Sequence, residues 1–230
     1  MSSKVIVSYD GTANEEDAIA LGRILGSAGA AVEIAYVRHA AEGDGEAERA
    51  AQSEAEGVLA KGLSILGDDG AQTHVVIDPS TPAGLGRLAE AEGADVIVFC
   101  SDSHTARGHV AVGNSAQRLI EGGRCAIAIA PVDLAEAADG VREIVAVGEG
   151  DGGAVASATA LAGALGAQVA PVMGEATDLL IIDSRADAPE GTVSISSAAA
   201  HLIEIARCAV IVLARGRALE FRAREVSGVA

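Results

Sequence analysis

Short apolar runs alternate along most of this chain with longer segments in which apolar residues recur every three or four positions. The short runs are typical of strands buried on both faces, and the longer segments are typical of helices. Strands are expected in the first part at residues 4–9, 32–37, 73–77, 95–100 and 125–130. Because strands and helices alternate strictly, the pattern predicts a parallel sheet with right-handed crossovers.

Polar and small residues mark the expected helix boundaries. Thr12 and Glu15 form a T-x-x-E pattern, which predicts a capping box for a helix that runs to about residue 27. A long second helix is expected to end at Gly67. Ser80, followed closely by a proline, predicts the start of a third helix. A fourth helix is expected at residues 114–123.

The second part of the chain is a shortened version of the first. Residues 131–140 are interpreted as a linker, and the strand pattern then restarts. Strands are expected at residues 142–147, 168–172, 178–182 and 208–213, with no counterpart of the third strand of the first part or of the two helices beside it. Residues 216–230 carry mixed charges and are predicted to form a solvated tail.

An internal repeat accounts for this organisation. Residues 95–131 and 178–214 align without a gap at a constant offset of 83 positions. Identical pairs include Asp95/Asp178, Ser101/Ser184, Gly108/Gly191, Leu119/Leu202, Ile120/Ile203, Glu121/Glu204, Arg124/Arg207 and Cys125/Cys208. Such a repeat indicates a tandem of one strand–loop–helix–strand unit. We therefore expect one domain over residues 1–133, a degenerate copy over 139–215, and the tail.

Composition narrows the classes of partner. Half of the 230 residues are apolar and only 2% are aromatic, which favours a parallel sheet with a core of small aliphatic side chains. A net charge of −17 argues against nucleic-acid and anionic-membrane partners, since both need a basic surface. No secretory signal or membrane span is recognised, so a cytoplasmic location is expected. The cysteines Cys100, Cys125 and Cys208 are expected to be reduced, buried thiols.

These elements together resemble the universal stress protein family in its tandem form. The resemblance covers nearly all of residues 4–131 and, less well, 142–214. It implies an open parallel sheet in the order 3-2-1-4-5, with the two copies paired through their last strands as a pseudo-dimer. The family's motif is Gly, two residues, Gly, nine residues, Gly, then Ser or Thr. It falls here on Cys100, Ser103, Gly113 and Asn114, so only its last glycine is retained.

The resemblance implies an adenine nucleotide site, for ATP or AMP, in the first copy. In the family, the residues matching Asp10 and Val37 hold the adenine. Asp10 follows the first strand at the switch point where open parallel sheets bind ligands. Glycines let backbone N–H groups approach phosphate closely, and a helix start adds further donors. The expected site residues are Tyr9, Asp10, Gly11, Val37, Cys100, Ser101, Ser103, Gly113, Asn114 and Ser115. No metal site is expected beyond nucleotide-bound Mg²⁺.

The same residues also allow structural interpretations. Asn114 and Gln117 fit an ordinary capping box, and Asp10-Gly11 is a good turn dipeptide. Asp102 would repel a phosphate unless His104 or Arg107 offset its charge. The sequence therefore leaves three functions open. The first is a non-catalytic stress-response protein that binds a nucleotide, and the second is a nucleotide-free adaptor. The third is a weak ATPase, or a protein phosphorylated on Ser101 or Ser103.

The second copy is expected to bind no nucleotide. Asp183 would stand at its phosphate end, Ala186 and Ser196 replace motif glycines, and Gly148 replaces Asp10. Residues 148–153 satisfy G-x-G-x-x-G, but two acidic residues within the pattern disfavour a pyrophosphate. No catalytic triad or metal-ligand spacing is recognised, so an enzyme is the weaker class. A homodimer of the whole chain is left open.

Overall fold

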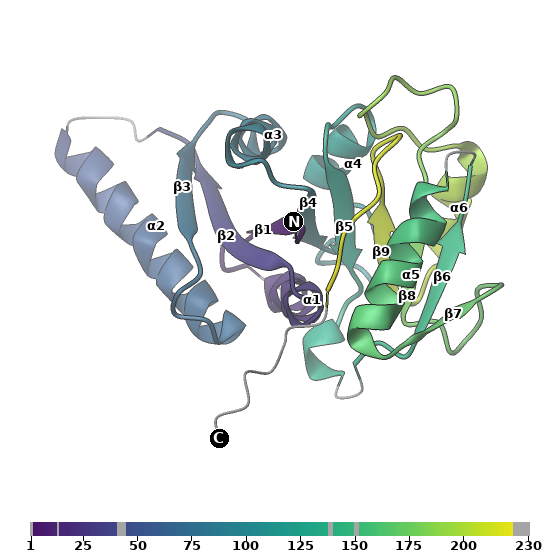
Figure 1. Cartoon of the computed structure of the whole chain (residues 1–230). Helices are drawn as coiled ribbons and strands as arrows, with labels where there is room; N and C mark the ends of the chain where they lie inside the picture. The colour runs from purple at the N-terminus through teal and green to yellow at the C-terminus, as the bar shows by residue number, and fades with distance from the viewer. Residues whose placement is uncertain (1, 13, 41–44, 138–139, 150–151, 223–230) are drawn as a thin grey trace.

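A computed structural model describes residues 2–12, 14–40, 45–137, 140–149 and 152–222. All its strands form one nine-stranded sheet in the order β3-β2-β1-β4-β5-β9-β8-β6-β7 (Figure 1). Every neighbouring pair is parallel except β5 and β9, which are antiparallel. The fold is thus an open, mostly parallel α/β sheet. It has more strands than the five implied for a single copy.

The first half of the sheet follows the expected alternation of strands and helices. Its elements are β1 (Lys4–Ser8), α1 (Glu15–Ser27), β2 (Ala31–Arg38), α2 (Gly45–Leu66), β3 (Thr73–Ile77), α3 (Thr81–Glu92), β4 (Val96–Cys100), α4 (Asn114–Ile120) and β5 (Ala126–Ala130). The strands lie within a residue or two of the expected ranges. The Ser80 hydroxyl caps α3 by accepting from the Ala83 N–H, as expected. Helix α4 is shorter than expected and ends at Ile120.

The second half repeats this plan in shortened form. Its elements are the 3₁₀ turn η1 (Leu134–Glu136), β6 (Glu143–Val147), α5 (Gly153–Leu165), β7 (Gln168–Ala170), β8 (Leu179–Ile182), α6 (Ser197–Ile205) and β9 (Ala209–Val212). Strand β6 lies between β7 and β8, as β1 lies between β2 and β4. In the described residues no strand pairs with the outer side of β7, where the first half continues to β3.

The two halves meet where β5 pairs with β9, the contact expected between the last strands of the two copies. Ala128 is opposite Ile211, which is also its equivalent at the 83-residue offset, so the pairing is centred on a local twofold axis. Two hydrogen bonds cross the junction reciprocally. The Val110 N–H donates to the Ala206 carbonyl (3.4 Å), and its equivalent Val193 N–H donates to the Gly123 carbonyl (2.8 Å).

Loop hydrogen bonds also recur at the same offset. The Ser101 hydroxyl donates to the Ala130 carbonyl (2.6 Å), and the Ser184 hydroxyl donates to the Leu213 carbonyl (2.6 Å). The loop N–H groups of Ala111 and Ser194 donate to these two hydroxyl oxygens. The loop after β4 and the loop after β8 therefore share one construction.

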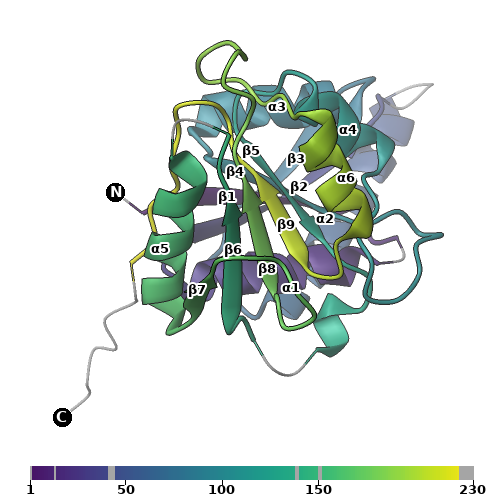
Figure 2. The ribbon, with the colours of Figure 1, turned by 90° about the vertical axis from the view of Figure 1, so that its right-hand side faces the viewer.

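Helices cover both faces of the sheet, and the core is continuous across the two halves (Figure 2). Apolar residues of α1, α2 and α5 pack on one face, and those of α3, α4 and α6 pack on the other. All five residues of β5 and all four of β9 are buried, so the junction lies in the centre of the core. No helix in the described part of the chain is long and apolar enough to cross a membrane.

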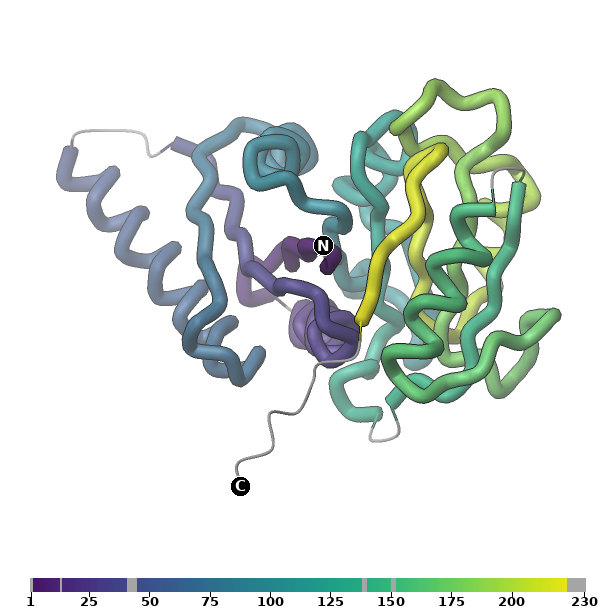
Figure 3. Tube along the Cα trace, in the orientation of Figure 1, coloured from purple at the N-terminus to yellow at the C-terminus, as the bar shows by residue number. Residues whose placement is uncertain are grey.

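The expectation of a solvated tail from residue 216 is wrong for its described part. Residues 216–222, here called the C-terminal strap, run from the second half back to the first (Figure 3). Leu219 and Phe221 are only 5% and 6% exposed and belong to the core. Their apolar side chains outweigh the mixed charges on which the prediction rested. Residues 223–230 lie outside the described residues.

Hydrogen bonds attach the strap to both halves. The Leu219 N–H donates to the Ser157 hydroxyl of α5 (2.8 Å), and the Arg222 N–H donates to the Ala28 carbonyl after α1 (3.0 Å). Between them, the backbone N–H of Ser3 donates to the Glu220 carbonyl (3.1 Å). The strap therefore joins the beginning of the chain to its second half.

The expected linker at residues 131–140 is also more ordered than its composition indicates. It contains η1, and the Asp17 carboxylate of α1 accepts from the N–H groups of Asp133 (2.9 Å) and Ala135 (2.8 Å). Burial raises the pKa of Asp17 above its ordinary value, although these two donors oppose the shift. Residues 138–139 lie outside the described part.

Candidate functional site

The carboxyl ends of β1, β2 and β4 meet at the switch point of the first half, where the sequence predicted a ligand site. Asp10 and Gly11 follow β1, Val37 lies near the end of β2, and Cys100 ends β4. The Asn14 side-chain amide donates to the Asp102 carbonyl (3.5 Å), which links the loop after β1 to the loop after β4. The fold thus brings together two of the segments on which the predicted site rests.

Glu15 already uses two of the backbone donors at this point. Its carboxylate accepts from the N–H of Gly11 (2.7 Å) and from the N–H of Asp10. The Glu15 side chain therefore contacts the backbone just after β1 and does not form the expected capping box with Thr12. Asn14 is the N-cap residue of α1. Burial, reinforced by the neighbouring Asp10, raises the pKa of Glu15 to about 8. The T-x-x-E pattern does not predict this role, because it pairs Glu15 with Thr12.

Cys100 borders the same acidic environment. Its side chain is half-buried, and burial, with Glu15 and Asp10 adding to it, raises the pKa of its thiol to about 12. Burial likewise raises the pKa values of Cys125 and Cys208 to about 12. All three are free cysteines, as expected, and they remain thiols at neutral pH. None is a ready nucleophile.

Two of the predicted site residues have structural roles. Ser101 is 1% exposed. Its hydroxyl donates to the Ala130 carbonyl and accepts from the Ala111 N–H. It is therefore not accessible for phosphorylation. Tyr9 is equally buried, and its ring lies against Gly62 of α2 on the core side. Ser103, in contrast, is exposed, and its hydroxyl lies 3.0 Å from Nδ1 of His104.

The segment Gly113–Ser115 forms an open turn into α4. Gly113 is the N-cap and Asn114 is the first helical residue, so the expected Asn114–Gln117 capping box is not formed. The Gln117 side chain instead donates to Glu121 (2.6 Å). A Cβ added at Gly113 would meet no heavy atom within 4 Å, so the space beside this glycine is open.

The charges around the site are mainly acidic. Asp10 and Asp102 lie in the two loops that form it, and Glu15 is the first residue of α1. Arg107 does not offset them, because its guanidinium pairs with Asp133 and with Glu136 (2.6 Å). Among the described residues, the basic side chain beside Asp102 is the exposed His104, at 3.6 Å. These acidic side chains disfavour a chain of phosphates, which needs cations or free N–H donors.

The equivalent point of the second half also holds a carboxylate of the protein. Asp183 follows β8 at the position equivalent to Cys100, and it is 1% exposed. Its Oδ1 accepts from the Ala154 N–H at the start of α5 (2.6 Å). Nearby, the Ser196 hydroxyl donates to Glu149. The G-x-G-x-x-G segment lies here, and its residues 150–151 are outside the described residues.

A cavity of about 480 Å³ lies elsewhere, on the local twofold axis between α4 and α6. It is lined by residues that are equivalent at the 83-residue offset, including Val112 and Ile195, and Ile120 and Ile203. The cavity is thus a product of the junction between the halves. It is separate from the predicted nucleotide site.

Comparisons with known proteins were made for both sequence and fold. No family model matches the chain, and no curated protein was found to be similar to it. A universal stress protein from Archaeoglobus fulgidus DSM 4304 has a similar structure, with a TM-score of 0.60 and 14% identity over 94% of this chain and all (100%) of that one. A candidate universal stress protein from Pseudomonas aeruginosa UCBPP-PA14 gives 0.62 and 14%, over 92% and 93% of the two chains. A protein of unknown function from Pseudomonas aeruginosa PAO1 gives 0.61 and 13%, over 92% of each chain.

The fold is therefore that of solved universal stress proteins. The matches extend over both halves of this chain, because each covers at least 92% of it within a single protein. At 13–14% identity these matches establish the architecture only, so a function has to be argued from the site residues.

Proposed function

We propose that this chain is a universal stress protein made of two fused copies, of which the first is complete and the second shortened. The twofold pairing of β5 with β9 supports this, because fusing two copies of one dimer-forming domain produces such a contact. The reciprocal hydrogen bonds at Val110 and Val193 support it independently. The pseudo-dimer is formed within one chain.

The proposed function of the first copy is non-catalytic binding of an adenine nucleotide. Asp10, Val37 and the loop from Cys100 to Ser103 would surround the adenosine, and the open space at Gly113 would admit one phosphate. Because Asp10 and Asp102 oppose further negative charge, we propose that AMP binds more tightly than ATP. The observation that carries the proposal is the convergence of these segments at the switch point.

Calorimetric titration of the full chain with AMP and with ATP tests this function. We expect AMP to bind more tightly than ATP, and Gly113→Val to weaken AMP binding at least tenfold, about 1.4 kcal/mol or more. The valine fits the free protein, because no atom lies near the added Cβ. Gly163→Val on α5 is the matched control, since its Cβ also has open space. Normal AMP binding by Gly113→Val would refute the proposed site.

One observation favours a second candidate, a nucleotide-free adaptor. Glu15 uses the N–H groups of Asp10 and Gly11, so the chain already supplies its own carboxyl group at this point. If neither AMP, ADP nor ATP binds at millimolar concentration and none co-purifies, the adaptor is the better function. Co-purified nucleotide is easy to detect at 260 nm, because the protein has two Tyr and no Trp.

In the second copy we propose that no nucleotide binds. Asp183 is buried at the start of α5 and accepts from the Ala154 N–H, a donor that a phosphate would otherwise use. A second phosphate-bearing ligand per chain in the titration would contradict this assignment.

A further inference from the structure

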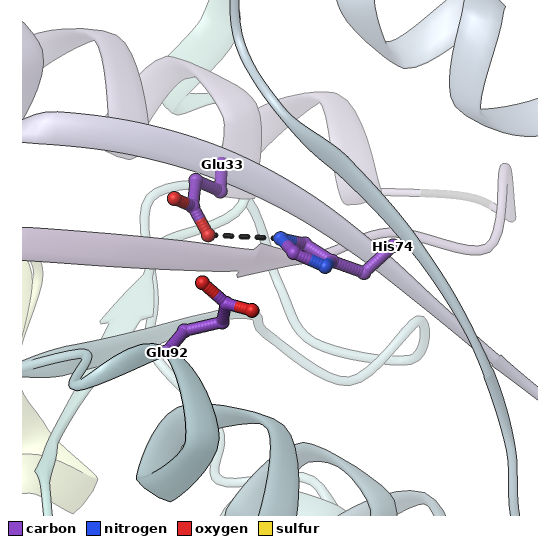
Figure 4. A group of neighbouring side chains, drawn as sticks. All are labelled: Glu33, His74 and Glu92. Atoms are coloured by element: carbon purple, nitrogen blue, oxygen red, sulfur yellow. Dashed lines mark hydrogen bonds and ion pairs between the residues drawn. The ribbon is translucent and has the colours of Figure 1, made fainter.

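A compact cluster of Glu33, His74 and Glu92 lies in the first half (Figure 4). One ligand atom from each residue lies within 4.8 Å of the others. His74 Nε2 is 2.9 Å from a carboxylate oxygen of Glu33, whose side chain is only 7% exposed. A buried carboxylate beside an imidazole and a second carboxylate is a donor set that suits a divalent transition ion.

The cluster is far along the strands from the proposed nucleotide site. Glu33 and His74 lie near the beginnings of β2 and β3, whereas ligands of such sheets bind at the carboxyl ends of the strands. Glu92 is the last residue of α3, the helix that covers this face. The cluster is therefore built from three elements, and it is independent of any nucleotide bound at Asp10.

Lys4 currently offsets part of the negative charge of the cluster. Its ammonium lies 3.0 Å from Glu33 Oε1 and 3.3 Å from Glu92 Oε2. Hydrogen bonds to these carboxylates raise the pKa of Lys4, so it remains charged. The Lys4 side chain is 27% exposed, whereas its backbone is fixed in β1 by pairing with Ala31. The ammonium can thus move to solvent without any change in the sheet.

We propose that Glu33, His74 and Glu92 form a Zn²⁺ site in which Lys4 is the internal competitor of the metal. Two carboxylates against one ammonium leave a net negative charge when His74 is neutral. Zn²⁺ would cancel that charge, bind the imidazole nitrogen as a third protein ligand, and keep a fourth position for water. The bound ion would fasten the start of β2, the start of β3 and the end of α3 together.

Titration of the full chain with Zn²⁺, in competition with a chelator, tests the site. Wild-type protein should bind one Zn²⁺ per chain. Lys4→Met keeps the aliphatic stem and removes the competing charge, so it should bind Zn²⁺ at least tenfold more tightly, a gain of about 1.4 kcal/mol or more. His74→Ala should bind at least tenfold more weakly on the same scale. Wild-type protein and Lys4→Met that bind no more Zn²⁺ than His74→Ala would overturn the proposal.

Three controls separate this site from other donors. His201→Ala removes another histidine with a glutamate neighbour, Glu204 at 3.6 Å, and should leave Zn²⁺ binding unchanged. If His74→Ala fails to fold, Glu92→Gln tests the ligand set in its place, because Glu92 is partly exposed at the end of a helix. Co²⁺ bound at the site should show visible d–d bands without a thiolate charge-transfer band. A thiolate band would assign the metal to a cysteine and refute the proposed ligands.

Discussion

The two halves of the sheet use one backbone plan, but they place a carboxyl group at the switch point from different positions. In the first half, Glu15 at the start of α1 reaches back to the N–H groups after β1. In the second half, Asp183 at the end of β8 reaches across to the start of α5. Cys100, the equivalent of Asp183, carries no charge. Loop geometry alone therefore does not define an anion site, because the chain can fill it with its own side chain.

The two halves also differ in how accessible the switch point is to a ligand. Asp183 is almost completely buried and lies over Gly148, with Ser196 and Glu149 joined beside it. In the first half the Gly113 turn has open space, and Ser103 is exposed. The second half therefore fills its own switch point with Asp183, whereas the first half retains an accessible edge.

Removing the Phe221 side chain should have the largest effect, because its ring is buried in the core that both halves share. The ring is 6% exposed in the core that α1 and α5 share. Phe221→Ala should lower the free energy of unfolding by about 3–5 kcal/mol. Val172→Ala, at a 72% exposed position, is the control and should change little. Urea denaturation monitored by circular dichroism measures both, and equal stability of the two variants would refute the role of the strap.

Removing the carboxylate of the second half should have the next largest effect. Asp183→Ala leaves the buried Ala154 N–H without its acceptor and should cost about 2–3 kcal/mol. Asp187→Ala removes an exposed carboxylate from the same loop and should cost far less. The comparison would fail if thermal melts gave the same destabilisation for both.

A smaller and equal effect is expected at the repeated serines. Ser101 and Ser184 make the same two hydrogen bonds in equivalent loops. Ser101→Ala and Ser184→Ala should each cost about 1–2 kcal/mol, because each leaves a buried donor and acceptor unpaired. Ser103→Ala, at an exposed position, should be neutral. Clearly unequal losses for the two buried serines, measured in the same urea series, would show that the loops are not energetically equivalent.

The remaining expected effect is a change at Glu15 in how the stability of the fold depends on pH. Folding raises its pKa from 4.5 to about 8, so the folded chain holds this proton more tightly than the unfolded chain does. The resulting stabilisation is complete below pH 4.5 and is lost as the pH rises through about 8. Glu15→Gln keeps an oxygen acceptor for Gly11 and should flatten stability over this window. Glu16→Gln, an exposed neighbour, is the control, and an unchanged pH profile in Glu15→Gln would contradict the raised pKa.

Periodicity and the repeat predicted most of the architecture. The strand runs and the restart after residue 131 follow from buried apolar runs and from the 83-residue offset, whereas the pairing of the last strands was implied by the family resemblance. The capping of α1 was missed, because Glu15 has donors both in its own helix and after β1. The strap was missed because Leu219 and Phe221 are isolated among charges, with no periodicity to indicate burial.

The candidate site was less predictable than the fold. The motif spacing correctly placed Asp10 and the Cys100 loop near one another. It also predicted that Ser101 contacts a ligand, whereas the Ser101 hydroxyl bonds to the backbone of the chain. Arg107 was a plausible counter-ion in the sequence, but Asp133 and Glu136 lie nearer to it in the fold. The Glu33–His74–Glu92 cluster has no sequence signal, because its members come from separate elements that only the sheet register brings together.

The position of the C-terminal strap has a consequence for the state of the chain during protein synthesis. A ribosome makes β1 to β5 long before residues 216–222, so a nascent first half lacks Leu219 and Phe221 on the α1 face. The backbone N–H of Ser3 likewise lacks the Glu220 carbonyl as its acceptor until Glu220 has been synthesised. The nascent first half would therefore display unfinished apolar surface of the kind that makes chaperones necessary. Residues 216–222 cover this surface only after both halves have been synthesised.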